Sequence, residues 1–470
     1  GTAALPFSVE QVSVHGACEE HMWALVSVDG ATSGSLRKMD IDLIGPDGSV
    51  RVSIRGFVTR ALESADEGNV FRFEPVLERL AQDTGGKPDA RRIVLLSSGL
   101  TNANGLDLRV PNCSYVVLDD AGDGDLSRKY LNLSRQLLRL LQKELEVGGV
   151  LVQLVLPGGE LNAPLAGLGA MLRSIHREHP GIRGQVITVR KDIDHGSLGS
   201  LLEKASAAPA GANLVADGRD LLMEVWKQCA GRLDGNRSPW RDNGVYLITG
   251  GTGKLGQILA GDVLEQAPGA TVVLVSRSPP DPVTAARLDA HPGLHHLCVD
   301  IADEQAVAAL VDGIRHEHGR LDGVVHAAGV LRDEGLARKT AEQLDTVLGP
   351  KVLGAEALDR AVGGARLDFF VLFSSISGIV GNPGQADYAA ANAFLDGFAQ
   401  AREIRRLKGQ CQGRTVSIAW PLWRNGGMEL SGGQTELMLR TTGLAPLETR
   451  QGLKAFYGAL NTDASRILVA

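Results

Sequence analysis

A glycine-rich turn between a strand and a helix constrains this chain more than any other feature of its sequence. The apolar run at residues 245–249 predicts a buried strand, Gly250-Gly-Thr-Gly-Lys-Leu-Gly256 follows directly, and residues 257–264 have a helical pattern. The last three of these four glycines satisfy the spacing GxGxxG, which lets the backbone turn tightly and approach a pyrophosphate closely. The sequence therefore predicts a dinucleotide site, with a glycine-rich turn that binds no ligand as the alternative.

Strands and helices alternate throughout the chain from residue 239 onward. Strand candidates lie at residues 245–249, 272–275, 296–299, 323–327, 369–373 and 416–419. Such alternation is typical of a doubly wound parallel sheet. We therefore predict a catalytic, dinucleotide-binding α/β subdomain over residues 239–470.

A shorter α/β series precedes this subdomain. Residues 93–96 and 115–118 have the pattern of buried parallel strands, and leucines recur every four residues from 133 to 145, which lines one face of a helix. The Ser-Ser-Gly turn at residues 97–99 lacks the phosphate-binding spacing. We therefore predict a truncated, cofactor-free Rossmann-like subdomain over residues 63–238.

Residues 1–62 have the alternation of β structure. Apolar residues alternate with aspartates at 40–43 and with polar residues at 50–54, and Pro46-Asp-Gly48 supplies a turn between the two runs. The predicted fold is thus α/β, with two Rossmann-like subdomains preceded by a short β-rich segment.

Charge and composition narrow the classes of partner. The 48 basic and 55 acidic side chains give a net charge of −7 and form no basic stripe, so neither nucleic acid nor an anionic membrane is expected as a partner. No apolar run approaches the roughly 18 residues of a spanning helix, and no signal-peptide pattern occurs, so a cytoplasmic location is expected. The five cysteines are scattered and the histidine pairs have no third ligand in view, so neither a disulfide framework nor a metal site is expected.

A basic residue that follows the second predicted strand of the 239–470 subdomain indicates that the cofactor is NADPH. An NAD-specific protein usually places an acidic residue there to bind the ribose 2′-hydroxyl, whereas Arg277, next to Ser276, favours a 2′-phosphate. Asp300, at the end of the third strand, is suited to accept a hydrogen bond from the adenine amino group. The alternative is a surface arginine that begins a loop.

Several motifs resemble the short-chain dehydrogenase/reductase family. Besides the glycine turn, the chain has His326-Ala-Ala-Gly329 after the fourth strand, and Ser375 lies thirteen residues ahead of Tyr388. Ordinary members carry lysine four residues after the tyrosine, where this chain has Asn392. The ketoreductases of polyketide and animal-type fatty acid synthases exchange these positions, and Lys351 matches the lysine that they carry upstream.

The resemblance to ketoreductases of modular polyketide synthases is more specific. It covers residues 373–385 and 417–423, and residues 164–180 resemble the cofactor-free structural subdomain that these enzymes carry in front. Residues 5–60 are similar to the C-terminal end of a dehydratase double hotdog without its catalytic histidine motif. We therefore expect a remnant or an excised boundary with no dehydration activity.

Residue chemistry and resemblance together assign roles to four side chains. Tyr388 is the expected proton donor to the carbonyl oxygen during hydride transfer, and the Lys351 ammonium is expected to lower its pKa. Ser375 is expected to hold the carbonyl, and Asn392 a water that replenishes the proton. The alternative is that the four residues have only structural roles, as a packed tyrosine, a surface lysine, a capping serine and a buried asparagine.

The residues expected to bind NADPH lie at the carboxyl ends of the predicted strands and in the turns that follow them. They are Thr249, Gly250, Gly251, Thr252, Gly253, Leu255, Gly256, Ser276, Arg277, Asp300, Ile301, Ala327, Ala328, Gly329 and Pro421. By resemblance, Pro421 packs near the nicotinamide, and residues 426–447 form a substrate lid with glycines at its base.

The resemblance also predicts the hand of the product. Members that form one alcohol carry Leu-Asp-Asp where this chain has Leu331-Arg332-Asp333, and the opposite type carries tryptophan in place of Gln385. We therefore expect a B-type, D-configured, usually 3R alcohol. Ala390 stands where a proline would mark the epimerising subtype.

The expected partners are a phosphopantetheinyl acyl carrier protein bearing a β-ketoacyl thioester and the other domains of the same synthase. Two alternatives remain. One is a reductase-inactive structural or epimerising module of the synthase, which the intact set of four polar residues disfavours. The other is a free-standing dehydrogenase of soluble alcohols, which the long cofactor-free half disfavours.

Overall fold

The computed structural model describes residues 4–19, 21–28, 36–61, 70–80, 91–100, 112–120, 125–189, 193–218, 220–229, 238–427, 439–440 and 443–470. These residues fall into two compact units. One lies within residues 1–69 and 430–445, and the other within residues 70–429 and 446–470. The predicted boundary at 238/239 lies inside the second unit, so the division of that unit into two subdomains stays a prediction.

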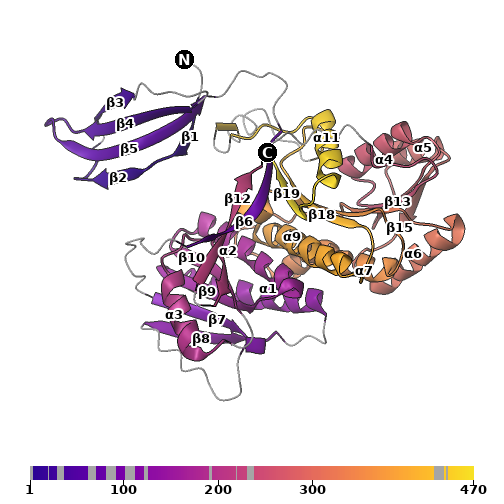
Figure 1. Cartoon of the computed structure of the whole chain (residues 1–470), viewed down its shortest axis with the longest axis horizontal. Helices are drawn as coiled ribbons and strands as arrows, with labels where there is room; N and C mark the ends of the chain where they lie inside the picture. Colours follow the sequence, from indigo (N-terminus) through magenta and orange to yellow (C-terminus); the bar gives the residue numbers. More distant parts are fainter. Residues whose placement is uncertain are drawn as a thin grey trace. The chain divides into compact units, whose positions relative to one another are not determined.

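The first unit contains an antiparallel five-stranded sheet (Figure 1). Its strands are β1 (Ala4–Ser8), β2 (Gln11–Val14), β3 (Trp23–Val28), β4 (Leu36–Ile44) and β5 (Val50–Ala61). The sheet order is β1-β5-β4-β3, and β2 also pairs with β5. The predicted hairpin is confirmed as β4 and β5, which Gly48 helps to join because it adopts a left-handed φ of 81°.

The second unit is built on one sheet of fourteen strands. The strands are β6 (Arg72–Arg79), β7 (Arg91–Ser97), β8 (Cys113–Leu118), β9 (Val150–Pro157), β10 (Ile182–Val189), β11 (Asn213–Asp217), β12 (Asp220–Gln228), β13 (Val245–Thr249), β14 (Thr271–Ser276), β15 (Leu294–Cys298), β16 (Gly323–His326), β17 (Phe369–Ser375), β18 (Arg414–Trp420) and β19 (Arg466–Val469). Every strand that the sequence predicted in this unit is present.

The order of these strands explains the two α/β series. Seven parallel strands run β15-β14-β13-β16-β17-β18-β19, and the sheet continues β6-β12-β11-β10-β9-β7-β8. Strand β6 is antiparallel to both β19 and β12 and therefore joins the two series. The strand order reverses at β13 and β16, which is where open α/β sheets usually bind ligands. The α/β class with two Rossmann-like halves is confirmed.

Helices cover the sheet of the second unit (Figure 1). They are α1 (Leu126–Glu144), α2 (Leu168–Glu178), α3 (His195–Ala205), α4 (Lys254–Gln266), α5 (Pro282–Asp289), α6 (Glu304–His318), α7 (Ala341–Val362), α8 (Ser377–Val380), α9 (Ala386–Leu407) and α11 (Thr449–Leu460), with 3-10 turns η1 (Ser98–Leu100) and η2 (Glu160–Gly167). Among the described helices, none is long and apolar enough to cross a membrane.

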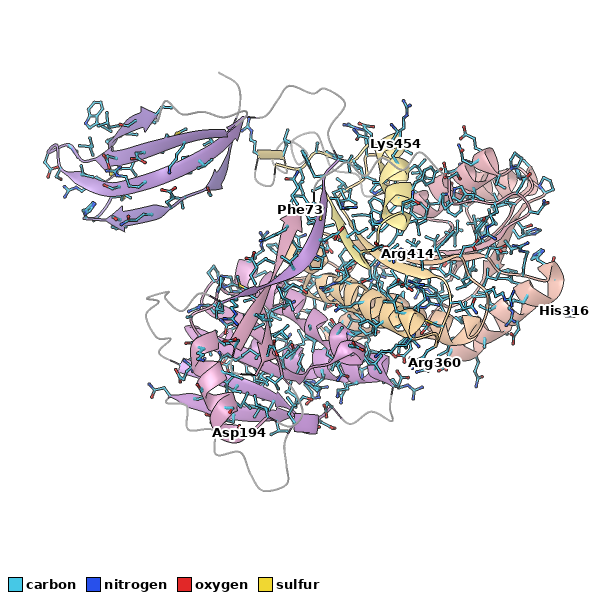
Figure 2. The ribbon with its side chains drawn as sticks, in the orientation of Figure 1. Phe73, Asp194, His316, Arg360, Arg414 and Lys454 are labelled. Carbon is cyan, nitrogen blue, oxygen red and sulfur yellow. The ribbon has the colours of Figure 1, made fainter. Side chains whose placement is uncertain are left out.

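One apolar core joins the two halves of the second unit, and side chains fill the space between helices and sheet (Figure 2). Leu137 of α1 and Phe394 of α9 are both fully buried in this core. Burial of a side chain of this size contributes about 1.5–3 kcal/mol. The Tyr130 hydroxyl of α1 also donates to the Ala390 carbonyl of α9, at 2.8 Å. The first half therefore supports the helix that carries Tyr388.

Candidate active site

The glycine turn is held in a conformation that only glycine tolerates well. Gly250 has a φ of 69°, and a Cβ on it would lie 2.9 Å from the Ala327 carbonyl oxygen and the Ala328 nitrogen. A Cβ on Gly256 would lie 2.7 Å from the Gly250 oxygen. The turn therefore closes tightly against the segment that follows β16, and α4 starts directly behind it.

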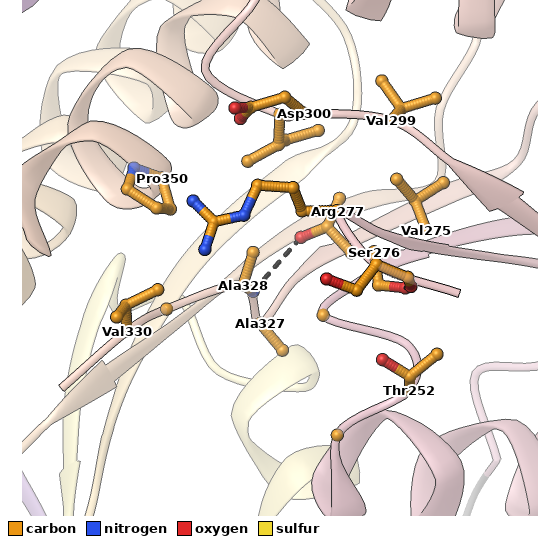
Figure 3. A pocket seen from close by; sticks show the side chains of 16 residues that line it. Thr252, Val275, Ser276, Arg277, Val299, Asp300, Ala327, Ala328, Val330 and Pro350 are labelled. Carbon is orange, nitrogen blue, oxygen red and sulfur yellow. Dashed lines mark hydrogen bonds between the residues drawn. The ribbon is translucent and has the colours of Figure 1, made fainter. Parts of the chain in front are cut away.

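A cavity of about 340 Å³ opens at the carboxyl ends of β13, β14, β15 and β16 (Figure 3). Residues that the sequence predicted and that line it are Thr249, Gly250, Thr252, Gly253, Ser276, Arg277, Asp300, Ile301, Ala327, Ala328 and Gly329. The predicted residues that do not line it are Gly251, Leu255, Gly256 and Pro421. The lining residues that sequence reasoning missed are Val275, Ser278, Val299, Val330 and Pro350. All five adjoin a predicted residue in sequence, so their position next to the predicted residues could have indicated them.

The residues around this cavity fit a dinucleotide. Gly253 is the N-cap of α4, and no described side chain caps its N–H groups, which leaves a site suited to a phosphate. Arg277 is exposed and makes no hydrogen bond or ion pair within the described parts of the chain. Figure 3 shows its side chain extending across the cavity in the direction of Pro350. The cavity therefore offers a free cation as well as free N–H groups to a ligand with several phosphates.

A buried histidine stabilises the turn that closes this cavity. The Thr249 hydroxyl lies 2.7 Å from His326 Nδ1 and accepts a hydrogen bond from the Ala328 N–H at 3.2 Å. Burial lowers the pKa of His326 to about 3, with a smaller effect from the Lys351 charge, so the imidazole is neutral at neutral pH. The Thr249 hydroxyl can then donate to Nδ1, which fixes β13 against the turn after β16.

The four predicted catalytic side chains converge from three elements. Ser375 ends β17, Lys351 lies on α7, and Tyr388 and Asn392 lie one turn apart on α9. Lys351 Nζ lies 5.9 Å from the centre of the Tyr388 ring and donates to the Phe373 carbonyl at 2.7 Å. The phenol also interacts with the side chains of Ser375 and Asn392. The structure thus brings together all four residues that the sequence selected.

Burial sets the pKa values of this cluster. It raises the pKa of Tyr388 above its usual value of 10.0, and the polar side chains of Asn392 and Ser375 offset only part of this rise. Burial also lowers the pKa of Lys351 to about 8. The net pKa of Tyr388 is therefore raised, not lowered as the sequence predicted, because desolvation of the phenol outweighs the effect of its polar neighbours Asn392 and Ser375. A protonated phenol at neutral pH still suits a proton donor.

Asn392 is fully buried and only partly satisfied. Its Nδ2 donates to the Tyr388 carbonyl at 2.7 Å, whereas its Oδ1 is buried without a hydrogen-bond partner among the described residues. A buried acceptor left unpaired costs about 1–3 kcal/mol. A hydroxyl or water donor is therefore expected beside this oxygen, in agreement with the role that the sequence assigns to Asn392.

Two of the three predicted stereochemical residues are in direct contact. Gln385 Nε2 donates to Asp333 Oδ2 at 3.0 Å, and the Asp333 charge contributes to the raised pKa of Tyr388. Leu331 lies two residues before Asp333 in the same loop. The predicted lid falls largely on residues 428–438 and 441–442, which lie outside the described residues.

Sequence reasoning missed two residues of the first half that reach the rim of this site. Glu178 of α2 accepts hydrogen bonds from the Leu336 N–H at 2.9 Å and from the Gly384 N–H at 2.7 Å. Gln142 of α1 donates to the carbonyls of Leu336 and Lys339 at 3.0 and 2.8 Å. These contacts join residues about 160 to 210 positions apart, so no local pattern indicates them.

Comparison with known proteins adds a family context to this geometry. A model of the KR domain matches residues 244–425, and a model of the polyketide synthase dehydratase N-terminal domain matches residues 1–69. The sequence resemblance points to the C-terminal end of a dehydratase, whereas the matching family model describes its N-terminal domain. Both agree that the segment is dehydratase-like.

Large multidomain proteins and a solved single domain both match this chain. It is 33% identical to the polyketide synthase PksL of Bacillus subtilis (strain 168), covering 100% of this chain and 11% of that protein. It is 32% identical to PksN of the same strain, covering 99% of this chain and 9% of that protein. The chain therefore spans about a tenth of these relatives. The crystal structure of a ketoreductase domain from the bacillaene assembly line superposes with a TM-score of 0.79 at 30% identity, covering 85% of this chain and 96% of that one.

Proposed function

Because this chain belongs to the ketoreductase domains of type I polyketide synthases and includes a dehydratase-like segment, we propose that it uses NADPH to reduce the β-keto group of a carrier-bound acyl chain. The convergence of Tyr388, Ser375, Lys351 and Asn392 is the observation that carries this proposal. The substrate is a β-ketoacyl thioester on the phosphopantetheine of an acyl carrier protein, and other domains of the synthase are the remaining partners. The structural and catalytic subdomains correspond to residues 63–238 and 239–470.

The proposed chemistry adds one hydride and one proton across a carbonyl group. NADPH held in the cavity beside Arg277 would supply the hydride for the carbonyl carbon. Ser375 holds the carbonyl oxygen, and Tyr388 donates its proton as negative charge develops on that oxygen. The charge of Lys351 stabilises the phenolate that remains, and a water held at Asn392 Oδ1 relays a proton from the solvent to it. The product is a β-hydroxyacyl thioester.

We expect a predominantly D-configured alcohol. Asp333, the more diagnostic residue of the Leu-Asp-Asp motif, supports this hand, because its charge acts on the Tyr388 phenol. It also accepts a hydrogen bond from Gln385, which stands where the opposite type carries tryptophan. The test incubates the chain with NADPH and a β-ketoacyl pantetheine thioester, follows the loss of NADPH absorbance, and separates the alcohols by chiral chromatography. A predominant L-alcohol would contradict the assigned hand. A chain that oxidises no NADPH would instead support the alternative of a reductase-inactive or epimerising module.

Replacing Arg277 by glutamine is expected to raise the KM for NADPH by about tenfold to a hundredfold, because a hydrogen bond to a charged phosphate contributes about 1.5–3 kcal/mol. The side chain extends into the cavity with no other partner among the described residues. The KM for NADH is the matched control and should change little, since NADH lacks the 2′-phosphate. An equal rise in both KM values would show that Arg277 does not recognise that phosphate.

A further inference from the structure

A fully buried ion pair lies next to the catalytic tyrosine and has no role in the chemistry proposed above. Lys339 Nζ lies 2.7 Å from Asp387 Oδ2, and the two side chains are 0% and 1% exposed. A buried ion pair is weak evidence for stability, because the loss of hydration of both charges offsets much of their attraction. What it joins is therefore more informative than its strength.

The ion pair connects the beginnings of two helices. Lys339 directly precedes Thr340, the N-cap of α7, whose side chain forms a capping box with Gln343. Asp387 lies in the first turn of α9, and its Oδ1 accepts a hydrogen bond from the Tyr388 N–H at 2.9 Å. Because α7 carries Lys351 and α9 carries Tyr388, the ion pair fixes the helix that holds the cation relative to the helix that holds the phenol.

The same ammonium also holds the loop that carries the stereochemical residues. Lys339 Nζ donates a second hydrogen bond, at 2.8 Å, to the Arg332 carbonyl. Arg332 stands between Leu331 and Asp333, and Gln385 at the start of α9 donates to Asp333 from the other side. The loop is therefore attached to the start of α9 at two points, through Lys339 and through Gln385.

We propose that Lys339 and Asp387 are positioning residues that keep the phenol of Tyr388 in register with Lys351 and with the 331–333 loop, and so maintain both the rate and the product hand. This inference rests on the proposed function of Tyr388. Neither side chain needs to touch the substrate. A displacement of about 1 Å at a reacting group can lower a rate by about a hundredfold, and rotation of the loop changes which face of the ketone meets the hydride.

If the ion pair only stabilised the fold, restoring stability would also restore activity. A double variant therefore distinguishes a positioning role from a purely structural one. Lys339→Met or Asp387→Asn alone leaves a buried charge without its partner and lowers Tm. Lys339→Met with Asp387→Leu leaves no charge behind and roughly conserves volume, so Tm should recover. The carbonyl of Arg332 and the N–H of Tyr388 still lose their partners in the double variant. Its rate and product ratio should therefore remain impaired.

The experiment compares the wild-type chain, the two single variants, the double variant and Arg338→Met. Arg338 is the matched control, because it is the neighbouring cation of the same loop and forms an exposed ion pair with Glu334 at 2.7 Å. We expect kcat to fall about tenfold to a hundredfold in the double variant at an unchanged KM for NADPH, with a larger share of the minor alcohol. Arg338→Met should match the wild-type chain in all three measurements.

Hydrogen exchange provides a measurement that does not depend on turnover. Amides of residues 331–340 and of the first turn of α9 should exchange at least several-fold faster in the double variant, whereas those of β13 should not change. A double variant with wild-type Tm, kcat, product ratio and exchange rates would overturn the inference. A wild-type chain that oxidises no NADPH would overturn the proposed function instead, and the exchange rates would still decide whether the ion pair holds the loop and helix together.

Discussion

Replacing Tyr388 by phenylalanine is expected to lower kcat by about 10²–10⁴-fold, the usual contribution of a positioned proton donor. The change removes one hydroxyl and keeps the ring, which packs beside Lys351. Burial raises the pKa of this phenol, so it carries its proton throughout the neutral range and is competent as an acid there. The measurement is the steady-state rate of β-ketoacyl thioester reduction, together with the Kd of NADPH from fluorescence titration, which should not change.

Tyr130→Phe is the matched control for this variant. Its hydroxyl is also buried and also bonds to α9, but it lies in α1 and its partner is the Ala390 carbonyl instead of a predicted catalytic side chain. Its loss should lower the free energy of unfolding by about 1 kcal/mol and leave kcat nearly unchanged. If Tyr388→Phe turned over at the wild-type rate, the phenol would not be the proton donor, and the proposed mechanism would be wrong.

The parts of the site that could be predicted from sequence are those that parallel strands place automatically. Thr249 pairs with His326 in register across β13 and β16, so their following turns necessarily meet at the same edge. Strand β17 continues that edge and ends at Ser375. Short apolar runs flanked by glycine-rich turns therefore indicated both the strands and the end of the sheet where the cavity lies.

The parts that could not be predicted depend on packing between distant segments. Lys339 follows Arg338 and precedes Thr340, a pattern typical of a solvated turn, yet it is among the most deeply buried side chains described. Glu178 likewise appears in the sequence as a charge at the end of an amphipathic helix. Its two hydrogen bonds to the loops around Tyr388 form only when the first half packs on the second.

The pKa directions also depended on packing. From residue types alone, a lysine near a tyrosine predicts a lowered phenol pKa. Whether attraction or desolvation dominates depends on how deeply both groups are buried, and here burial raises the pKa of Tyr388 and lowers that of Lys351. A sequence identifies the members of such a cluster more easily than it predicts their protonation.

Lys351→Met is expected to lower kcat by about 10²–10³-fold, because it removes the positive charge that stabilises the phenolate. In the wild-type chain this charge is lost as pH rises through the pKa of Lys351, about 8. The rate should therefore fall above about pH 8, and the residual rate of the variant should not show that step. The measurement is a pH profile of kcat for both proteins.

In the Lys351→Met variant, activity should fall without a loss of stability. Burial lowers the pKa of Lys351 from 10.5 to about 8, so the unfolded chain binds more protons between these values, and the wild-type chain gains stability as pH rises through that window. At pH 7 the buried ammonium costs about 3 kcal/mol, and its removal offsets the loss of a donor to the Phe373 carbonyl, which costs about 1–3 kcal/mol. At pH 7 the variant should therefore keep the lowered kcat predicted above, with a Tm no lower than that of the wild-type chain. If Tm fell so far that the variant was unfolded at the assay temperature, the lost activity would show that Lys351 supports the fold rather than the phenolate.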